Sequence, residues 1–246
     1  MKFDDRTIDH LQGRSFSNAL ELAIGDRGPN LDRVSFLVDL CRGKRVIDLG
    51  FADHLELIDS KSHDATWLHG ELSAVAQRCL GVDISEASVE RARKLGFDDV
   101  LRVDITLDPI SAMESDTWDL LVLGEVLEHV DDPVAFLSAA RARYGSQVGR
   151  LVITVPNAFS ARNLLGAMRG REVVNSDHRF WFTPYTLAKV VTEAGWLPEW
   201  FRYCESFPRH ASGSPIHRIR QLASTTVKSF APALRPDLIM GATLAR

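Results

Sequence analysis

The chain has 246 residues, of which 45% are hydrophobic and 25% charged, so a globular core is expected and global disorder is excluded. Its net charge of −4 argues against a surface that binds nucleic acid over its whole extent, and no apolar run approaches the ~20 residues of a membrane span. Three scattered cysteines without a zinc-type spacing, and a polar start unlike a signal peptide, favour a reducing, cytoplasmic location.

The first half of the chain predicts a cap followed by alternating strands and helices. Residues 1–42 are expected to form an N-terminal helical cap, in which residues 31–41 have the apolar period of an amphipathic helix. Residues 45–49 form a short β-branched run that predicts a buried strand. Residues 53–65 are polar and lack a clear period, which predicts an inserted loop, and a helix is expected over residues 67–80.

The remaining elements have clear local signals. Helices are expected where a capping residue precedes a helical segment, over residues 86–95, 132–144 and 183–195. Strands are expected at the apolar runs 81–84, 99–103, 119–124, 150–155, 200–204 and 238–245. Residues 206–236 are rich in basic side chains and predict a basic helical insertion before the last strand at 237–246. This alternation predicts a mostly parallel sheet with helices on both faces.

Small or acidic residues follow several predicted strands. Asp48 precedes Gly50, where the backbone can turn sharply without a Cβ, and Asp83 and Asp104 follow the next two strands. Ligands of such sheets bind outside the carboxyl ends of the strands, so the series predicts a site for a nucleoside. Our hypothesis is that this nucleoside is S-adenosyl-L-methionine (AdoMet). Each acid alone also suits a local role: a strand-to-loop turn, a helix cap or a solvated loop.

Each acid suits a different part of AdoMet. The charge of Asp48 can act on the turn or on the ammonium group of the ligand. Asp83 can accept hydrogen bonds from both ribose hydroxyls. Asp104 can accept from the adenine amino group, while Ile105 packs against the ring.

Four motifs together carry a family resemblance. Asp48-Leu49-Gly50, Gly81-Val82-Asp83, Val103-Asp104-Ile105 and residues 118–130 resemble successive motifs of class I AdoMet-dependent methyltransferases. Segments 118–130, 151–157 and 177–184 are similar to the ubiquinone-type O-methyltransferases within that class.

The resemblance covers roughly residues 40–205 and implies a fold. The expectation is one domain over residues 1–246, with an AdoMet-binding core at 43–205. Its fold class is α/β: a Rossmann-like three-layer sandwich whose seven-stranded, mostly parallel sheet has an antiparallel last strand.

The resemblance also implies a set of cofactor contacts. The residues expected to bind AdoMet are Asp48, Gly50, Phe51, Ala52, Asp83, Ile84, Asp104, Ile105, Gly124 and Glu125. The family's first loop has the pattern D-x-G-x-G-x-G, whereas this chain has Ala52 and His54 at the second and third glycine positions. This departure leaves open both the pose of the methionine tail and the retention of activity.

Two histidines are the candidates for acid–base chemistry. A hydroxyl acceptor must lose its proton, and imidazole titrates near neutral pH. His129 lies just past the fourth strand and His178 lies before the helix at 183, and structural roles are open for both. Glu125, Glu128 and His129 could also bind a divalent ion, a question that the sequence leaves undecided.

Residues after the fifth strand offer two interpretations. Aromatic rings with amide and guanidinium groups would suit a sugar or a ring-bearing acceptor, and they would equally suit packing of the last helix on the sheet. These residues are Asn157, Phe159, Arg162, Asn163, Phe180, Trp181 and Phe182.

Together these features predict a methyltransferase that acts on a small-molecule or glycan acceptor at oxygen. A nucleic-acid partner is not expected, and a homo-oligomer is possible. One alternative is a noncatalytic binding protein that kept the fold. Another is an NAD-dependent Rossmann enzyme, which needs G-x-G-x-x-G, whereas residues 50–55 keep only the first glycine.

Overall fold

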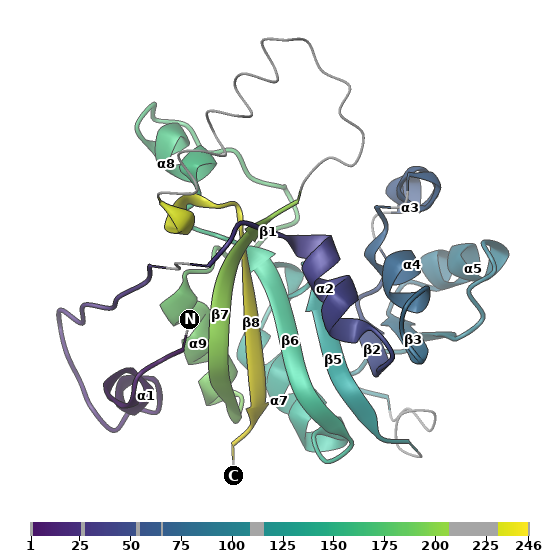
Figure 1. The fold of residues 1–246 in the computed structure, drawn as a ribbon, viewed down its shortest axis with the longest axis horizontal. Coiled ribbons are helices and arrows are strands. Elements are labelled where there is room, and N and C mark those ends of the chain that lie inside the picture. The colour runs from purple at the N-terminus through teal and green to yellow at the C-terminus, as the bar shows by residue number, and fades with distance from the viewer. Residues whose placement is uncertain are drawn as a thin grey trace.

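The computed structural model is built on one eight-stranded sheet (Figure 1). It describes residues 2–25, 28–52, 55–64, 66–108, 116–206 and 231–245. The strands are β1 (Leu31–Asp32), β2 (Arg45–Leu49), β3 (Arg78–Asp83), β4 (Val100–Arg102), β5 (Trp118–Gly124), β6 (Val148–Pro156), β7 (Trp196–Glu205) and β8 (Asp237–Leu244). Their order across the sheet is β1-β7-β8-β6-β5-β2-β3-β4.

The expected α/β fold is confirmed. Strands β4, β3, β2, β5 and β6 run parallel to one another, and β8 is antiparallel to both β6 and β7. The two-residue β1 pairs with β7 and adds an edge strand to the seven that were expected. The chain leaves β2 on one side toward β3 and later returns on its other side as β5, so the strand order reverses between β2 and β5. Such a switch point is where open α/β sheets bind ligands.

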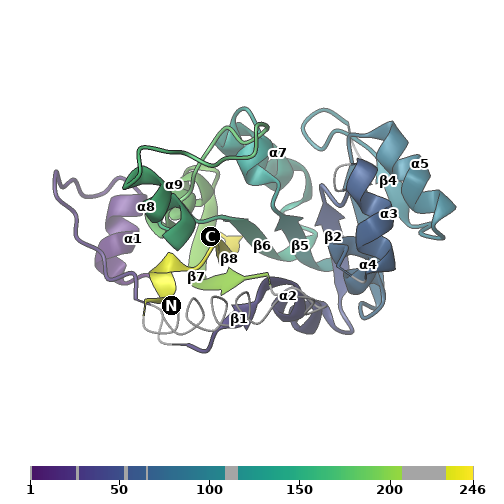
Figure 2. The same ribbon diagram turned by 90° about the horizontal axis from the view of Figure 1, so that it is seen from above.

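Helices cover both faces of the sheet (Figure 2). They are α1 (Asp5–Leu11), α2 (Arg33–Cys41), α3 (Leu55–His63), α4 (Leu68–Ser73), α5 (Glu86–Lys94), α7 (Pro133–Tyr144), α8 (Ala161–Ala167) and α9 (Pro184–Glu193), with 3-10 turns η1 (Leu127–His129) and η2 (Pro232–Leu234). Buried side chains of α1, α7 and α9 share one core cluster with the strands, and those of α2 and α4 share a second. A third cluster joins α3, α5 and β4.

The alternation of side chains along the central strands produces these two main layers. In β2, Ile47 belongs to the cluster beneath α7 and α9, whereas Val46 belongs to the cluster beneath α2. Leu121 and Leu120 of β5 divide in the same way. Successive side chains of a strand point to opposite faces, and both faces here are apolar because helices cover both.

The capping signals define the helix starts as expected. The side chains of Ser85 and Asp132 accept the backbone N–H of Ser88 and Ala135 at the starts of α5 and α7. At the start of α9, Thr183 and Thr186 form a reciprocal capping box.

Three expectations about local structure were wrong. The polar stretch 53–65, expected as a loop, contains α3, whose Ile58 is fully buried against α5 and Trp67. Tertiary packing therefore supplies stability that its weak period did not indicate. The helix expected over residues 67–80 is shorter, because α4 ends at Ser73 and β3 already begins at Arg78. Helix α8 was not expected at all. The predicted basic insertion falls mainly on residues 207–230, which lie outside the described residues.

No helix in the described segments is both long and apolar enough to cross a bilayer.

Candidate functional site

A cavity of about 1310 Å³ opens at the carboxyl ends of β2, β3 and β5. Its volume is large enough for a nucleoside together with a second small molecule. All ten residues expected to contact the cofactor line it: Asp48, Gly50, Phe51, Ala52, Asp83, Ile84, Asp104, Ile105, Gly124 and Glu125. Glu128, His129 and His178 line it as well.

The turn after β2 requires glycine. Gly50 has φ +72°, which L side chains rarely adopt, and a Cβ there would lie 2.5 Å from Cγ2 of Val126. Its N–H donates to the carbonyl oxygen of Val82 at 2.7 Å, which ties the turn to the end of β3. The backbone can therefore approach a ligand closely, as a cofactor cradle requires.

Asp48 is held by a histidine that the sequence did not single out as its partner. Both side chains are buried, and Oδ2 of Asp48 lies 3.0 Å from Nδ1 of His69. A Cβ at Gly81 would lie 2.8 Å from Cε1 of His69, so the glycine makes room for the ring. The carboxylate is thus oriented by α4 while it still borders the cavity.

Asp83 organises the backbone at the end of β3. Its Oδ2 accepts the N–H of Ala52 at 3.1 Å, and its Oδ1 accepts the N–H of Ser85 at 2.8 Å. Burial raises its pKa, and these hydrogen bonds oppose that rise. Each oxygen keeps a lone pair, so the carboxylate can serve the turn and accept hydroxyl hydrogen bonds at the same time.

Asp104 is preorganised by Thr106. Oδ1 of Asp104 accepts the backbone N–H of Thr106 at 2.8 Å and its hydroxyl at 2.6 Å. The hydrogen bond from the hydroxyl is the main cause that lowers the pKa of Asp104. The neighbouring Ile105 is almost fully buried, whereas Ile84 is largely exposed in the cavity. An apolar side chain held open to the cavity suits contact with a flat apolar ligand surface.

Arg33 and Glu125 form a charged pair that the sequence analysis missed. Glu125 is the one non-glycine residue of the described chain with positive φ, at +60°. Its Oε1 lies 4.0 Å from Nη1 of Arg33, which also donates to Oγ1 of Thr154 at 3.4 Å. Burial favours the neutral form of Arg33, but the charge of Glu125 and other acids raises its pKa overall. No local motif at the start of α2 indicated that Arg33 would reach the cavity.

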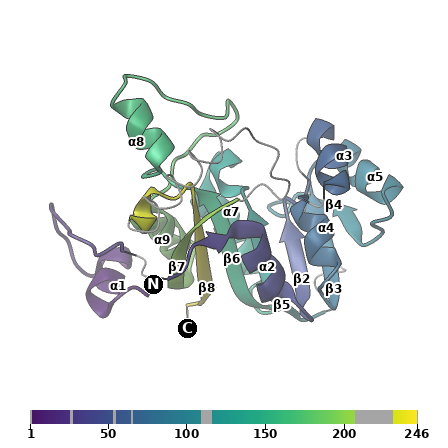
Figure 3. The ribbon, with the colours of Figure 1, turned by 45° about the horizontal axis from the view of Figure 1, so that its top comes forward.

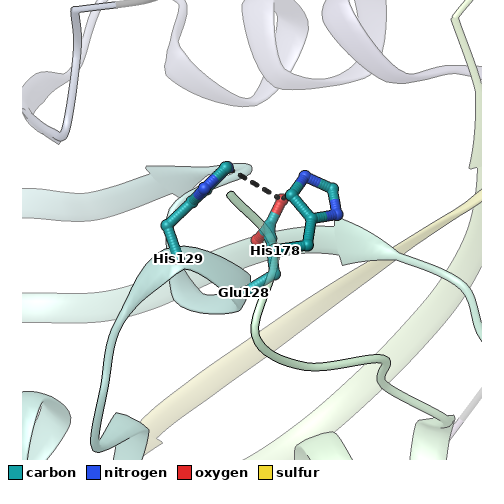
Figure 4. Close-up of side chains that lie close together, drawn as sticks. All are labelled: Glu128, His129 and His178. Carbon is teal, nitrogen blue, oxygen red and sulfur yellow. Dashed lines mark ion pairs between the residues drawn. The ribbon is translucent and has the colours of Figure 1, made fainter. Parts of the chain in front are cut away.

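Glu128, His129 and His178 also line this cavity, and Figure 4 shows their side chains close together. Oε1 of Glu128 lies 4.0 Å from Nε2 of His129 and 3.9 Å from Nε2 of His178. The two rings meet edge to face, with centroids 4.6 Å apart. Arg179 fixes this meeting, because its N–H donates to the carbonyl oxygen of Glu128 at 2.8 Å and its guanidinium donates to that of His129.

Within the described part of the chain, the Glu128 carboxyl is buried without a hydrogen bond that would stabilise its charge. It is fully buried, and neither oxygen has a hydrogen-bond partner among the described residues. Burial, followed by the charge of Glu125, raises its pKa to about 9. A buried carboxylate is stable only when it is protonated or beside a cation. An imidazolium or a bound metal ion would supply that charge.

These three side chains also match a metal-ligand set. One donor atom from each lies within 4.8 Å of the others. Two imidazoles and one carboxylate on one side of an open cavity suit a divalent transition metal such as Mn²⁺ or Zn²⁺. The sequence suggested Glu125, Glu128 and His129 as possible metal ligands. In the structure, His178 from the loop before α9 takes the place of Glu125 in this group.

Two of the residues considered for acceptor binding, Asn157 and Phe182, are part of the protein interior and do not line the cavity. Asn157 is buried, and its amide donates to the carbonyl oxygens of Ala233 and Arg235. Phe182 belongs to the main core cluster. For these two residues the packing interpretation holds.

Comparisons with known proteins agree with this geometry. A family model described as "Methyltransferase domain" matches residues 25–197. The ubiquinone biosynthesis O-methyltransferase of Bordetella parapertussis is 24% identical over 203 residues, which cover 78% of this chain and 76% of that protein.

Two solved structures show the shared fold. A methyltransferase of Thermotoga maritima, described as SAM-dependent and as a possible histamine N-methyltransferase, has a TM-score of 0.54 at 17% identity. The match covers 86% of this chain and 87% of that chain. Magnesium protoporphyrin IX methyltransferase of Synechocystis PCC 6803, solved with bound SAH, has a TM-score of 0.50 at 15% identity. It covers 85% and 78% of the two chains.

The matched family model spans most of the chain. It includes all the residues that line the cavity, from Arg33 to Arg179. The first loop, although it lacks two of the usual glycines, keeps the turn at Gly50. The chain therefore belongs to the methyltransferase-domain family and is a class I methyltransferase with S-adenosylmethionine as its methyl donor.

Proposed function

We propose that the protein transfers the methyl group of AdoMet to a hydroxyl oxygen of a small-molecule or glycan acceptor. The observation that carries this proposal is the cluster of Glu128, His129 and His178 in the same cavity as the strand-tip acids. Its distant relatives named as ubiquinone biosynthesis O-methyltransferases also support transfer to oxygen.

The cofactor end of the cavity is assigned to the strand tips. Asp83 accepts the ribose hydroxyls and Asp104 accepts the adenine amino group. The turn at Gly50 allows the backbone to approach the methionine tail, and Arg33 offers a guanidinium to its carboxylate. Bound AdoMet supplies a methyl group on a sulfonium sulfur, already activated for displacement by a nucleophile.

The acceptor end is assigned to the cluster. Alignment of the hydroxyl with the methyl group is the main requirement of an in-line displacement. His129 or His178 accepts the hydroxyl proton. Oε1 of Glu128 lies 4.0 Å and 3.9 Å from Nε2 of the two rings and sits between them beside the cavity. The same three side chains would hold a divalent ion, which would supply Lewis-acid activation of the acceptor hydroxyl.

The test begins with isotope-labelled AdoMet and fractions of cell extract to find the acceptor. With the acceptor in hand, His129→Ala and His178→Ala are each expected to lower the methylation rate by roughly 10²-fold or more. Affinity for S-adenosylhomocysteine (SAH), measured by calorimetry, should stay near that of the wild type. The matched control is His63→Ala, because His63 lies on α3 with an exposed side chain outside the cavity. Rates within a few-fold of wild type for both variants would remove the acid–base proposal.

Removal of metal separates the two roles of the cluster. Dialysis against a chelator, followed by addition of Mn²⁺, Zn²⁺ or Mg²⁺, is expected to change activity only if the ion participates. Unchanged activity after chelation assigns proton removal to the imidazoles alone. The identity of the methylated atom is read by mass spectrometry, and a product methylated at nitrogen or carbon would exclude the proposed acceptor chemistry.

A further inference from the structure

Helix α8 turns its polar side toward the protein and its apolar side toward solvent. The amide of Asn163 donates to the carbonyl oxygens of Asn157 and Ala158, which fixes that side of the helix against the end of β6. Leu164, Leu165 and Met168 are exposed, Met168 by 76%. A helix of a globular protein normally has the reverse orientation.

Exposed apolar side chains continue on both sides of the helix in the sequence. Of the ten large hydrophobic side chains identified as exposed in the described chain, seven lie between residues 159 and 180. These seven are Phe159, Leu164, Leu165, Met168, Val173, Val174 and Phe180, and we call them the α8 face. Concentration of exposed apolar side chains in one segment marks an interaction site rather than ordinary scatter.

The segment projects from the body of the protein. Figures 1 and 3 both show α8 standing clear of the sheet on the side of the strand ends that border the cavity. No residue of α8 is buried. After the helix, the chain folds back through a hydrogen bond from the N–H of Arg171 to the carbonyl oxygen of Gly166. The indole N–H of Trp181 donates a hydrogen bond to Oε1 of Glu172 at 3.0 Å. Because the Trp181 ring also contacts that of His178, this bond anchors the segment beside His178.

Positive charges border the α8 face. Arg162 lies in the first turn of α8, and Arg169 lies in the turn that follows the end of the helix. Arg171 follows the helix, and all three arginines are exposed. The segment 159–180 carries four arginines against the two acids Glu172 and Asp177.

We propose that the α8 face docks on the surface of an anionic lipid bilayer. Exposed Leu, Met and Phe side chains bordered by arginine are the pattern of an interfacial segment, in which apolar groups enter the headgroup boundary and cations contact anionic lipids. A second copy of the chain fits less well, because the segment has four arginines and only two acids, so a two-fold contact would bring together two segments of like net charge. Since Asn175, His178 and Arg179 border the cavity, docking would also bring its mouth close to the membrane.

The test is binding of the 246-residue chain to vesicles, measured by flotation. Vesicles of phosphatidylcholine mixed with phosphatidylglycerol are expected to bind the protein, and vesicles of phosphatidylcholine alone to bind it far less. Higher salt should weaken binding because it screens the arginines. Equal binding to both vesicle types, or to neither, would overturn the proposal.

Variants locate the contact. Leu164→Ser combined with Met168→Ser should reduce vesicle binding at least tenfold, and Arg162→Gln and Arg169→Gln should each reduce it on the order of fivefold. The matched controls are Phe16→Ser, at an apolar side chain that is 85% exposed, and Arg42→Gln, at an exposed arginine of the α2 end. Both controls should bind as the wild type does.

Two further measurements separate the alternatives. SAH binding by calorimetry checks that each variant is folded, and it tests the cofactor site independently of the membrane. Light scattering over a range of protein concentrations tests self-association. A dimer that Leu164→Ser abolishes would assign the α8 face to a second copy and overturn membrane docking.

Discussion

At the scale of single residues, Asp83 has a structural role beside its proposed role in ribose binding. Its carboxylate accepts two backbone N–H groups and still borders the cavity. Removal of the whole side chain would also release the turn at Ala52 and the start of α5. The conservative Asp83→Asn is therefore a sharper test of ribose binding than an alanine variant.

We expect Asp83→Asn to weaken SAH and AdoMet binding by ~1–3 kcal/mol, the usual contribution of hydrogen bonds to a charged acceptor. Calorimetry measures this change. Asp39→Asn, on the exposed surface of α2, is the matched control and should leave affinity unchanged. Unaltered affinity in Asp83→Asn would show that the ribose contact lies elsewhere.

Glu128 predicts a dependence of stability on pH. Burial, followed by the charge of Glu125, raises its pKa from 4.5 to about 9. The folded protein therefore keeps a proton that the unfolded chain releases above pH 4.5. The resulting stabilisation is complete below pH 4.5 and is lost as the pH rises to about 9.

In metal-free buffer, the free energy of unfolding of the wild type should fall between pH 5 and pH 9 by on the order of a few kcal/mol more than that of Glu128→Gln. Urea titrations at several pH values measure it. Glu86→Gln, at an exposed glutamate, should follow the wild-type curve. Parallel curves for wild type and Glu128→Gln would contradict the raised pKa.

At the scale of elements, the turn between β2 and α3 depends on one glycine. Gly50→Ala should destabilise the protein by at least ~1–2 kcal/mol, because alanine is strained at a φ of +72°. The clash of its Cβ with Val126 adds to this cost. Combining Gly50→Ala with Val126→Ala should remove the clash with Val126 but leave the backbone strain.

A double-mutant cycle of these two substitutions by thermal unfolding measures the difference. The double variant should be less destabilised than the sum of the single variants. Strict additivity would show that the turn relaxes away from Val126 and that only backbone strain opposes alanine.

The elements that were predictable have strong local signals. Apolar runs and capping residues predicted β2, β5, α5, α7 and α9 closely. Helix α3 was missed because its polar sequence has a weak period and its stability comes from packing against α5. Helix α8 was missed because its apolar side faces solvent, so its pattern resembles neither a buried helix nor a polar loop.

At the scale of the whole molecule, the sheet brings distant segments to one cavity. Parallel pairing of β2 with β3 and β5 aligns their carboxyl ends, which collects Asp48, Asp83 and Glu125. All ten predicted cofactor contacts border the cavity for this reason, although their individual roles stay predictions. The pairing of Asp48 with His69, and the reach of Arg33 to Glu125, depend on how α4 and α2 pack and have no local signature.

The acceptor end shows the same division. His129 follows β5 directly, so its place beside the cavity followed from the strand pattern. The approach of His178 to Glu128 requires a long segment to return across the molecule, where Arg179 fixes it to the backbone of η1.

The amino-acid sequence by itself determined the strand tips, the glycine turn and the helix starts, because each depends on the chemistry of a few adjacent residues. Only the tertiary structure decided which side chains share a cavity, which carboxyl is left without a partner and which helix exposes its apolar side. Those properties depend on burial and on contacts between segments far apart in the chain, and no local pattern specifies them.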